Sequence, residues 1–249
     1  MKFPDVLIAA LLKANSLVFF TGAGISAESG ISTFRGKGGI WNKMKPEELA
    51  NFDAFMKKPD LVWEWYQYRR KIINETGPNP AHTAIAEFEK YYSDVSVVTQ
   101  NVDNLHNRAG SKNVFELHGN IEKNYCVDCE THYSSPEITF SEKVPKCEKC
   151  GGLIRPDIVW FGEMLPQDVF INGDKAAARC DICFIIGTSA VVYPAAHIPI
   201  TARDKGAYLV EINIEESNIS DKVNCFLKGK AGVILPALLN EIMNKIKPQ

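Results

Sequence analysis

The chain has 249 residues, with 28 Lys and Arg against 30 Asp and Glu, which gives a formal net charge of −2. This balance argues against a general nucleic-acid binder, which would carry a strong basic excess. A hydrophobic content of 45% and a charged content of 23% exclude a largely disordered chain. The length predicts one large domain, or one domain with a smaller module.

The first residues resemble a short signal peptide, because Lys2 precedes an apolar run. Lys13, Asn15 and Ser16 break that run, so a helix over 3–14 and a strand over 17–20 are expected instead. No stretch approaches the ~20 apolar residues that span a bilayer. The seven cysteines, an odd number that includes C-x-x-C pairs, favour metal binding in a reducing compartment. We therefore expect a cytoplasmic protein without membrane or nucleic-acid partners.

Short apolar runs alternate with helical patterns along most of the chain. The predicted strands are 17–20, 95–99, 114–117, 158–160, 182–186 and 207–212, and the predicted helices lie near 81–91, 103–109, 166–179, 195–205 and 231–246. Continuous apolar character is typical of strands buried on both faces of a parallel sheet. The alternation predicts the α/β class, with a Rossmann-like doubly wound parallel sheet.

Two segments interrupt this alternation, and we interpret them as insertions. Residues 36–75 combine glycines with helical, aromatic-rich sequence, and residues 120–155 hold four paired cysteines. We predict that 36–75 and 120–155 form a smaller domain, a helical module plus a zinc ribbon. Residues 1–35, 76–119 and 156–249 then form the Rossmann-type domain.

A glycine motif directly follows the first predicted strand. Residues 21–27 read TGAGISA and match G-x-G-x-x-A, in which glycines permit a tight strand-to-helix turn and a close approach of the backbone to a pyrophosphate. A tight turn needs glycine in any case, so the motif alone also fits a structural role. No acidic residue follows ~20 residues later to hold a ribose. Instead, the segment 29–36 leads into further glycines and could be a mobile lid over a nucleotide, with Arg35 pairing with phosphate or ordering the lid.

Two C-x-x-C pairs have the spacing of a zinc ribbon. Cys126 and Cys129 are separated by 17 residues from Cys147 and Cys150. Four thiolates fill a tetrahedral zinc site completely and leave no position for water, so the predicted role is structural. A redox role for these cysteines, or nucleic-acid binding by the ribbon, is the alternative.

A third C-x-x-C pair, Cys180 and Cys183, has no second pair beside it. Cys183 falls within an apolar strand, where free cysteine behaves as a small hydrophobe. We expect both of these thiols to be buried.

Polar residues follow several predicted strands, at the edge of the sheet where α/β proteins bind ligands. Gln100, Asn101 and Asp103 follow the second strand, and Asn and Asp at that point could also simply cap the next helix. His118, which precedes a glycine, is a candidate base, although a core role is equally open. The segments 187–189 and 211–213 end two further strands. The convergence of five strand ends predicts a binding site more strongly than any one motif.

Taken together, the strings GAGISAESGISTFRG, TQNVDNLH, ELHGN, GTS and EIN and the two C-x-x-C pairs resemble the sirtuin family of NAD-dependent protein lysine deacylases. They run in the family's order over nearly the whole chain. The resemblance implies NAD as a consumed co-substrate, one structural Zn²⁺ held by the four paired cysteines, and acylated lysine side chains of proteins as substrates.

The resemblance also implies roles for individual residues. His118 matches the catalytic base, and Asn101 is a second catalytic candidate. The residues expected to bind NAD are Gly22, Ala23, Gly24, Thr33, Phe34, Arg35, Gln100, Asn101, Asp103, Gly187, Thr188, Ser189, Asn213, Glu215 and Ala231. The residues Val159, Trp160, Phe161 and Gly162 match the segment that pairs with the substrate backbone as an added strand.

The family's reaction gives these residues a chemical purpose. Nicotinamide leaves the ribose, the acyl oxygen attacks the same carbon, and the base accepts a proton from a ribose hydroxyl. The expected products are free lysine, nicotinamide and O-acyl-ADP-ribose. Because an amide oxygen is a poor nucleophile, the site must orient the reactants and exclude water.

Tyr66 and Arg69 lie three residues apart in a predicted helix, so they share a face. A guanidinium beside a phenol can receive a carboxylate, and the Y-x-x-R pattern resembles the sirtuins that remove succinyl and malonyl groups. A packing Tyr and a surface Arg are the alternative, with acetyl-lysine as the main substrate. An NAD-dependent oxidoreductase and a non-enzymatic zinc-ribbon scaffold are alternatives of other classes.

Overall fold

The computed structural model describes residues 1–33, 39–40 and 45–246. Its larger sheet has six parallel strands in the order β3-β2-β1-β7-β8-β9. The strands are β1 (Ser16–Thr21), β2 (Asp94–Thr99), β3 (Val114–Glu116), β7 (Ile182–Ile186), β8 (Tyr208–Asn213) and β9 (Cys225–Lys228). The central strand β1 pairs with β2 on one side and with β7 on the other. The chain order therefore reverses beside β1, which is the switch point where doubly wound sheets bind ligands.

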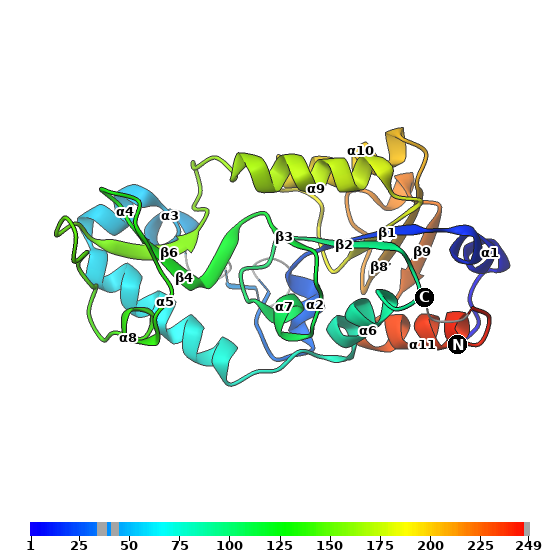
Figure 1. Cartoon of the computed structure of the whole chain (residues 1–249), viewed down its shortest axis with the longest axis horizontal. Coiled ribbons are helices and arrows are strands. Elements are labelled where there is room, and N and C mark those ends of the chain that lie inside the picture. Colours follow the sequence, from blue (N-terminus) through cyan, green and yellow to red (C-terminus); the bar gives the residue numbers. More distant parts are fainter. Residues whose placement is uncertain (34–38, 41–44, 247–249) are drawn as a thin grey trace.

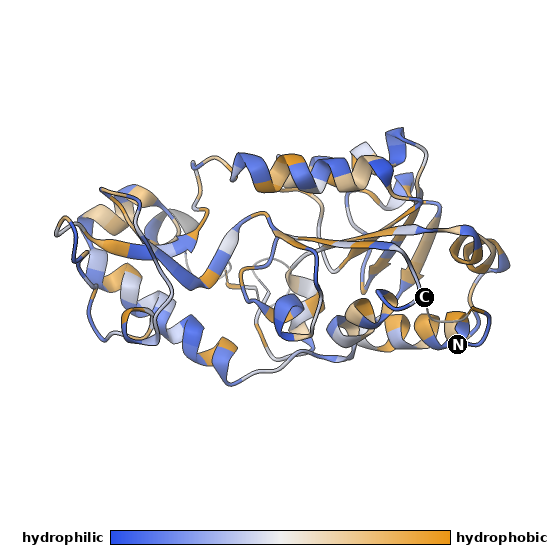
Figure 2. Ribbon diagram, viewed as in Figure 1, coloured by the Kyte–Doolittle hydropathy of each residue, from blue (hydrophilic) through white to orange (hydrophobic). Residues whose placement is uncertain are grey.

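Helices cover both faces of this sheet (Figure 1). On one face lie α1 (Asp5–Lys13), α6 (Pro80–Phe88) and α11 (Ala231–Met243), and on the other lie α9 (Gln167–Arg179) and α10 (Ile198–Asp204). The strands are rich in apolar residues, which Figure 2 shows as orange ribbon between the helices, and their side chains belong to the apolar clusters on both faces. Phe19 and Phe184 stack across β1 and β7 at a centroid distance of 4.8 Å. Burial on both faces explains why these strands have no polar alternation.

A second, three-stranded antiparallel sheet stands at the opposite end of the molecule (Figure 1). It consists of β4 (Gly119–Cys126), β5 (His132–Tyr133) and β6 (Ile154–Ile158), and the helices α3 (Pro46–Leu49), α4 (Phe52–Lys57), α5 (Pro59–Asn74) and α8 (Pro136–Thr139) surround it. Phe55, Val62 and Trp160 belong to the apolar core of this part. The buried Arg70 donates to the carbonyls of Ile121 and Thr139, which joins α5 to β4 and α8.

Further short elements in the described ranges include α2 (Ala23–Ala27), α7 (Leu105–Arg108) and the 3₁₀ turns η2 (Ala195–His197) and η3 (Ser220–Lys222). No helix in the described ranges is long and apolar enough to cross a membrane. The division of the chain into two domains with the boundaries given above stays a prediction.

One predicted strand position was wrong, and one strand was not predicted. The run 158–160 is not a strand of the parallel sheet, because the strand there is Ile154–Ile158 and it pairs antiparallel with β4. The run is apolar because Trp160 packs in the core beneath α5. The edge strand Cys225–Lys228 was missed, since it is short and only the first of its four residues, Cys225, is buried.

Candidate active site

A cavity of about 700 Å³ lies at the carboxyl ends of β1, β2, β3, β7 and β8. It is lined by nearly all the predicted site residues that the structure describes: Gly22, Ala23, Gly24, Thr33, Tyr66, Arg69, Gln100, Asn101, His118, Val159, Trp160, Phe161, Gly162, Gly187, Thr188, Ser189, Asn213, Glu215 and Ala231. The predicted convergence of five strand ends is therefore confirmed. Phe34 and Arg35, which were expected in the lid, lie outside the described residues.

The glycine motif after β1 is required by packing against the end of β7. A Cβ atom on Gly22 would lie 2.7 Å from the Cβ of Thr188, and one on Gly24 would lie 2.7 Å from the Cα of Gly187. Gly187 itself has a φ of +58°, a region that glycine adopts without strain. The two strand ends thus approach with no side chain at Gly22, Gly24 or Gly187 between them.

Gln100 and Asn213 brace the opposite sides of the Gly187–Ser189 turn. The Nε2 group of Gln100 donates to Oγ1 of Thr188 at 3.0 Å. The Nδ2 group of Asn213 donates to the carbonyl of Thr188 at 3.0 Å, and its Oδ1 accepts from the Ile214 N–H. Three strands are therefore linked around one turn, which gives this part of the cavity a fixed shape.

His118 follows β3 and enters the cavity with a defined tautomer. Its Nδ1 lies 2.9 Å from the carbonyl oxygen of Gln100, and since a carbonyl only accepts, Nδ1 carries the proton. Nε2 is then the basic nitrogen of the neutral ring. Gly119, with a φ of +79°, turns the chain directly after His118, and a Cβ there would lie 2.1 Å from the Asp157 carbonyl oxygen. The glycine beside the histidine is thus needed to start β4 against β6.

Asn101 is held from behind by a buried polar network. Its Nδ2 donates to the Gly22 carbonyl at 3.1 Å and to Oγ of Ser26 at 3.2 Å, so Oδ1 is what the amide offers a ligand. Ser26 in turn donates to Oδ2 of Asp103 at 2.7 Å. Burial raises the pKa of Asp103, and the bonds from Ser26 and the Leu105 N–H oppose that rise. Asp103 supports Ser26 and is not among the lining residues, and its contact with NAD stays a prediction.

Two buried histidines complete this network, and neither was singled out from the sequence. The His82 and His106 rings lie 4.9 Å apart. His106 Nε2 contacts Oγ1 of Thr21 at 2.9 Å, whereas its Nδ1 has no partner in the described part of the chain. Burial lowers the pKa of His82 to about 4. Burial also lowers the pKa of His106, and the neighbouring His82 lowers it further. Both rings are therefore neutral at pH 7.

This pair predicts that the protein loses stability as the pH falls. An unfolded histidine has a pKa near 6.5, so between pH 6.5 and pH 4 the unfolded chain binds more protons than the folded one, and the free energy of unfolding decreases with falling pH. We expect His82 alone to lower it by about 2 kcal/mol between pH 7.5 and pH 5. Urea unfolding of His82→Asn at the two pH values should show a smaller loss than the parent, whereas the exposed His197→Asn should match the parent. Equal pH dependence in all three proteins would contradict this assignment.

Tyr66 and Arg69 of α5 reach the same cavity from its other side. Both are buried, and the guanidinium carbon of Arg69 lies 5.4 Å from the centroid of the Trp65 ring. Burial raises the pKa of Tyr66 to about 12, so the phenol keeps its proton. Burial lowers the pKa of Arg69, and nearby Tyr66 and Asp103 raise it again. A guanidinium and a protonated phenol in one apolar wall are suited to an anionic group.

The backbone segment Val159–Gly162 forms the rim between these two sides. The Val159 N–H donates to the His118 carbonyl at 3.0 Å, and the Phe161 N–H donates to the Ala50 carbonyl at 2.9 Å. Pairing of this rim with a peptide through these residues must therefore use their carbonyl oxygens. The rim is tied directly to the residue that carries the candidate base.

Several lining residues were not anticipated from the sequence. They include Glu28, Trp65, Glu163, Tyr193, Ser217, Asn218 and Lys230. Glu28 stands within the matched string after β1, and its Oε1 accepts from the Gly232 N–H at 2.9 Å, which ties this turn to the start of α11. Trp65 lies in α5, and the others lie outside the regular elements without a recognisable motif, so no sequence signal could have placed them.

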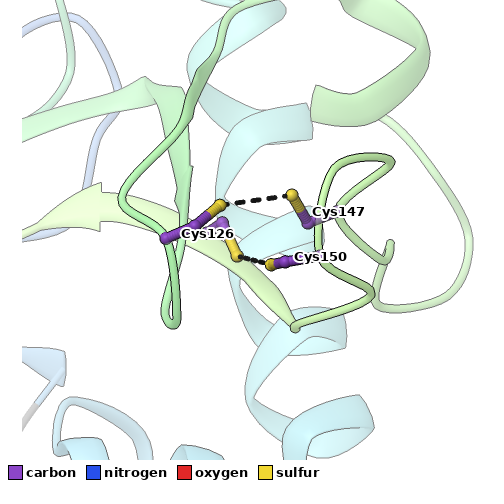
Figure 3. A group of neighbouring side chains, drawn as sticks. Cys126, Cys147 and Cys150 are labelled. Carbon is purple, nitrogen blue, oxygen red and sulfur yellow. Dashed lines mark hydrogen bonds between the residues drawn. The ribbon is translucent and has the colours of Figure 1, made fainter.

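The four paired cysteines come together at the end of the small sheet (Figure 3). Their Sγ atoms all lie within 4.8 Å of one another, with Cys126 and Cys150 3.4 Å apart and Cys129 and Cys147 3.5 Å apart. Tetrahedral zinc with Zn–S near ~2.3 Å requires sulfur separations of about 3.8 Å. The cluster fits a closed four-thiolate zinc site, and all four ligand positions are filled by protein.

The third C-x-x-C pair lies elsewhere, in the layer between the large sheet and α9. Cys180 and Cys183 are both buried free thiols, and Cys183 is a core residue of β7. Cys180 donates to the Ala177 carbonyl. Their predicted burial is confirmed.

The fold and the cavity define an α/β protein with a dinucleotide-type crevice at its switch point and a four-cysteine module beside it. The Sir2 family model matches residues 22–194, and the chain belongs to this family. The chain is 52% identical to an NAD-dependent protein deacylase of Pyrococcus furiosus, over 93% of this chain and 95% of the relative. Its structure resembles a Sir2 homologue solved as an NAD complex, with a TM-score of 0.90, 43% identity, and coverage of 98% of this chain and 95% of that one. It also resembles a Sir2 variant solved with a deacetylated p53 peptide and 3′-O-acetyl-ADP-ribose, with a TM-score of 0.87, 35% identity, and coverage of 95% and 97%.

Proposed function

We propose that this protein removes acyl groups from lysine side chains of proteins and consumes NAD in doing so. The observation that carries the proposal is the single cavity that joins the strand-end residues, His118 and the rim Val159–Gly162. A nucleotide in the strand-end half and an acylated lysine entering past the rim would meet at His118. The names of the related proteins, which are NAD-dependent protein deacylases, support the same activity.

His118 is the proposed general base. With Nδ1 donating to the Gln100 carbonyl, Nε2 is the atom that accepts a proton from a hydroxyl of the bound sugar. Bound NAD supplies an electrophilic ribose carbon once its bond to nicotinamide breaks. The two hydrogen bonds that Nδ2 of Asn101 donates orient the side-chain amide. Its Oδ1 is therefore suited to accept from the carboxamide of NAD or from a ribose hydroxyl. In this proposal Gln100 holds ribose, and Thr188, Ser189 and Asn213 surround the adenosine half.

The competing activity with the same fold is hydride transfer by an oxidoreductase. A deacylase releases one nicotinamide for each lysine that it frees and produces no absorbance of reduced cofactor. We expect nicotinamide from incubations with NAD and an acylated peptide, and none when the peptide carries unmodified lysine. Accumulation of NADH during turnover would favour the oxidoreductase instead.

We further propose that acidic acyl groups, succinyl and malonyl, are the preferred substrates. Tyr66 and Arg69 line the cavity near the rim and supply a phenol donor and a guanidinium inside an apolar wall. A buried carboxylate opposite a guanidinium gains on the order of 2–5 kcal/mol relative to its unpaired state. A protein that acts mainly on acetyl-lysine, with acidic acyl groups as secondary substrates, is the alternative.

Substitution Arg69→Met tests this preference. Removing the guanidinium should lower kcat/KM for a succinyl-lysine peptide by about 30-fold or more, while kcat/KM for the acetyl peptide changes only a few-fold. Arg69→Lys keeps the charge without the planar fork and should fall between the two. Equal losses on both peptides would show that Arg69 does not read the acyl carboxylate.

The zinc module and the compartment are part of the proposal. The four-cysteine cluster would hold one Zn²⁺ that stabilises the module and takes no part in the chemistry. We retain 36–75 and 120–155 as the smaller domain. Thiol ligands and buried free cysteines suit a reducing environment, so we place the enzyme in the cytoplasm.

A further inference from the structure

The indole of Trp160 makes a hydrogen bond to the phenol of Tyr66 that connects the rim to the acyl side of the cavity. Nε1 of Trp160 donates to Oη of Tyr66 at 2.7 Å, and both side chains are buried. An indole N–H can only donate, so the phenol oxygen must accept in this pair. No atom in the described ranges of the chain accepts a hydrogen bond from the Tyr66 O–H itself. The Tyr66 O–H can therefore donate a hydrogen bond to a group that enters the cavity.

The position of the Trp160 ring is fixed by an ion pair between the buried Arg155 and the half-buried Glu163. The guanidinium carbon of Arg155 lies 3.3 Å from the centroid of the Trp160 ring, and Arg155 is 1% exposed. Its Nη1 and Nη2 atoms donate to the two carboxylate oxygens of Glu163 at 2.5 Å and 3.0 Å. Glu163 also accepts from the Trp160 backbone N–H at 2.7 Å. Both the backbone and the ring of Trp160 are thus held, so its N–H has a fixed direction.

We propose that Trp160 is a positioning residue for acyl selectivity, because its indole N–H occupies the phenol oxygen of Tyr66 and directs the Tyr66 O–H toward an acidic acyl group. A phenol without this donor could rotate and present its oxygen lone pairs, which repel a carboxylate. Burial raises the pKa of Tyr66 to about 12, so the donor form persists at neutral pH. The inference rests on the proposed preference for acidic acyl groups and extends it to a residue on another element.

The test is a double-substitution cycle with acyl selectivity as the readout. Selectivity is the ratio of kcat/KM for a succinyl-lysine peptide to that for the matched acetyl-lysine peptide, so a general loss of folded enzyme cancels. Trp160 is replaced by 3-benzothienylalanine, which keeps the ring size and removes only the N–H, and by Trp160→Phe as the genetically encoded version. Each change is combined with Tyr66→Phe, which removes the hydroxyl with little change in volume. Arg69→Met is measured alongside.

We expect Tyr66→Phe to lower the selectivity about tenfold, and the loss of the Trp160 N–H to lower it severalfold in the parent protein. In the Tyr66→Phe background, loss of the N–H should change the selectivity less than twofold, since the residue through which it acts is gone. If the effects of the two changes on selectivity multiply, or if Tyr66→Phe leaves the selectivity unchanged, the proposed role of Trp160 is overturned. A lowered ratio in Arg69→Met would then show that the preference for acidic acyl groups itself holds. If Arg69→Met also leaves the ratio unchanged, the acidic-acyl preference fails and this inference with it.

Discussion

His118→Ala should lower kcat/KM for deacylation by about 10²–10⁴-fold, the usual contribution of a positioned base. The ring lies in the cavity with Nδ1 bonded to the Gln100 carbonyl, so removing it takes away the proton acceptor without disturbing a buried core. Binding of NAD should change little, because Gln100 keeps its own bonds to Thr188. Steady-state kinetics with an acylated peptide, together with calorimetric binding of NAD, measures the two effects separately.

The matched control is His197→Ala, which removes an exposed histidine at the start of α10. It should retain the parent's rate. A His118→Ala protein that is folded and retains more than about a tenth of the parent's activity would contradict the assignment of the base.

Loss of a cysteine from the four-thiolate cluster should unfold the small module and abolish activity. A closed structural zinc site contributes on the order of ten kcal/mol to its domain, and Cys147→Ser removes one of four ligands. The module is continuous with the site, because β4 begins directly after His118 and pairs Gly119 with Ile158, next to the rim. Its unfolding must therefore displace both the proposed base, His118, and the rim Val159–Gly162.

The unfolding of the module can be followed by three measurements. These are zinc content by elemental analysis, near-ultraviolet circular dichroism, and limited proteolysis within 120–155. The Trp63 indole donates to the Ser141 carbonyl at 2.9 Å and so gives the dichroism a local probe of the module. Cys180→Ser is the control, since Cys180 is buried away from the cluster. A Cys147→Ser protein without zinc but with the parent's dichroism and activity would refute the structural role.

The sequence predicted the parts of the fold that depend on local pattern. Runs such as 182–186 are buried on both faces, so their apolar character is continuous and unambiguous. The strand ends were placed in one site because parallel strands bring their carboxyl ends to one edge, and the cavity contains Gln100, His118 and Thr188 together. The cysteine cluster was predicted for a similar reason, since ligand spacing follows from the geometry of the metal.

What could not be predicted depends on contacts between distant segments. The glycines after β1 serve the approach to Gly187, a fact that neither segment reveals alone. The His82–His106 pair and the Trp160–Tyr66 bond join residues 24 and 94 positions apart. The apolar run at 158–160 was misplaced because pattern distinguishes burial from exposure but does not say against which sheet a residue is buried.

In the proposed reaction, the acyl group passes from lysine to the sugar of NAD. The direct measurement is mass spectrometry of a reaction with NAD and a peptide whose lysine carries a ¹³C-labelled succinyl group. We expect the label in O-succinyl-ADP-ribose, with one nicotinamide released for each lysine freed. Label recovered as free succinate from the start of the reaction, with NAD left intact, would contradict it.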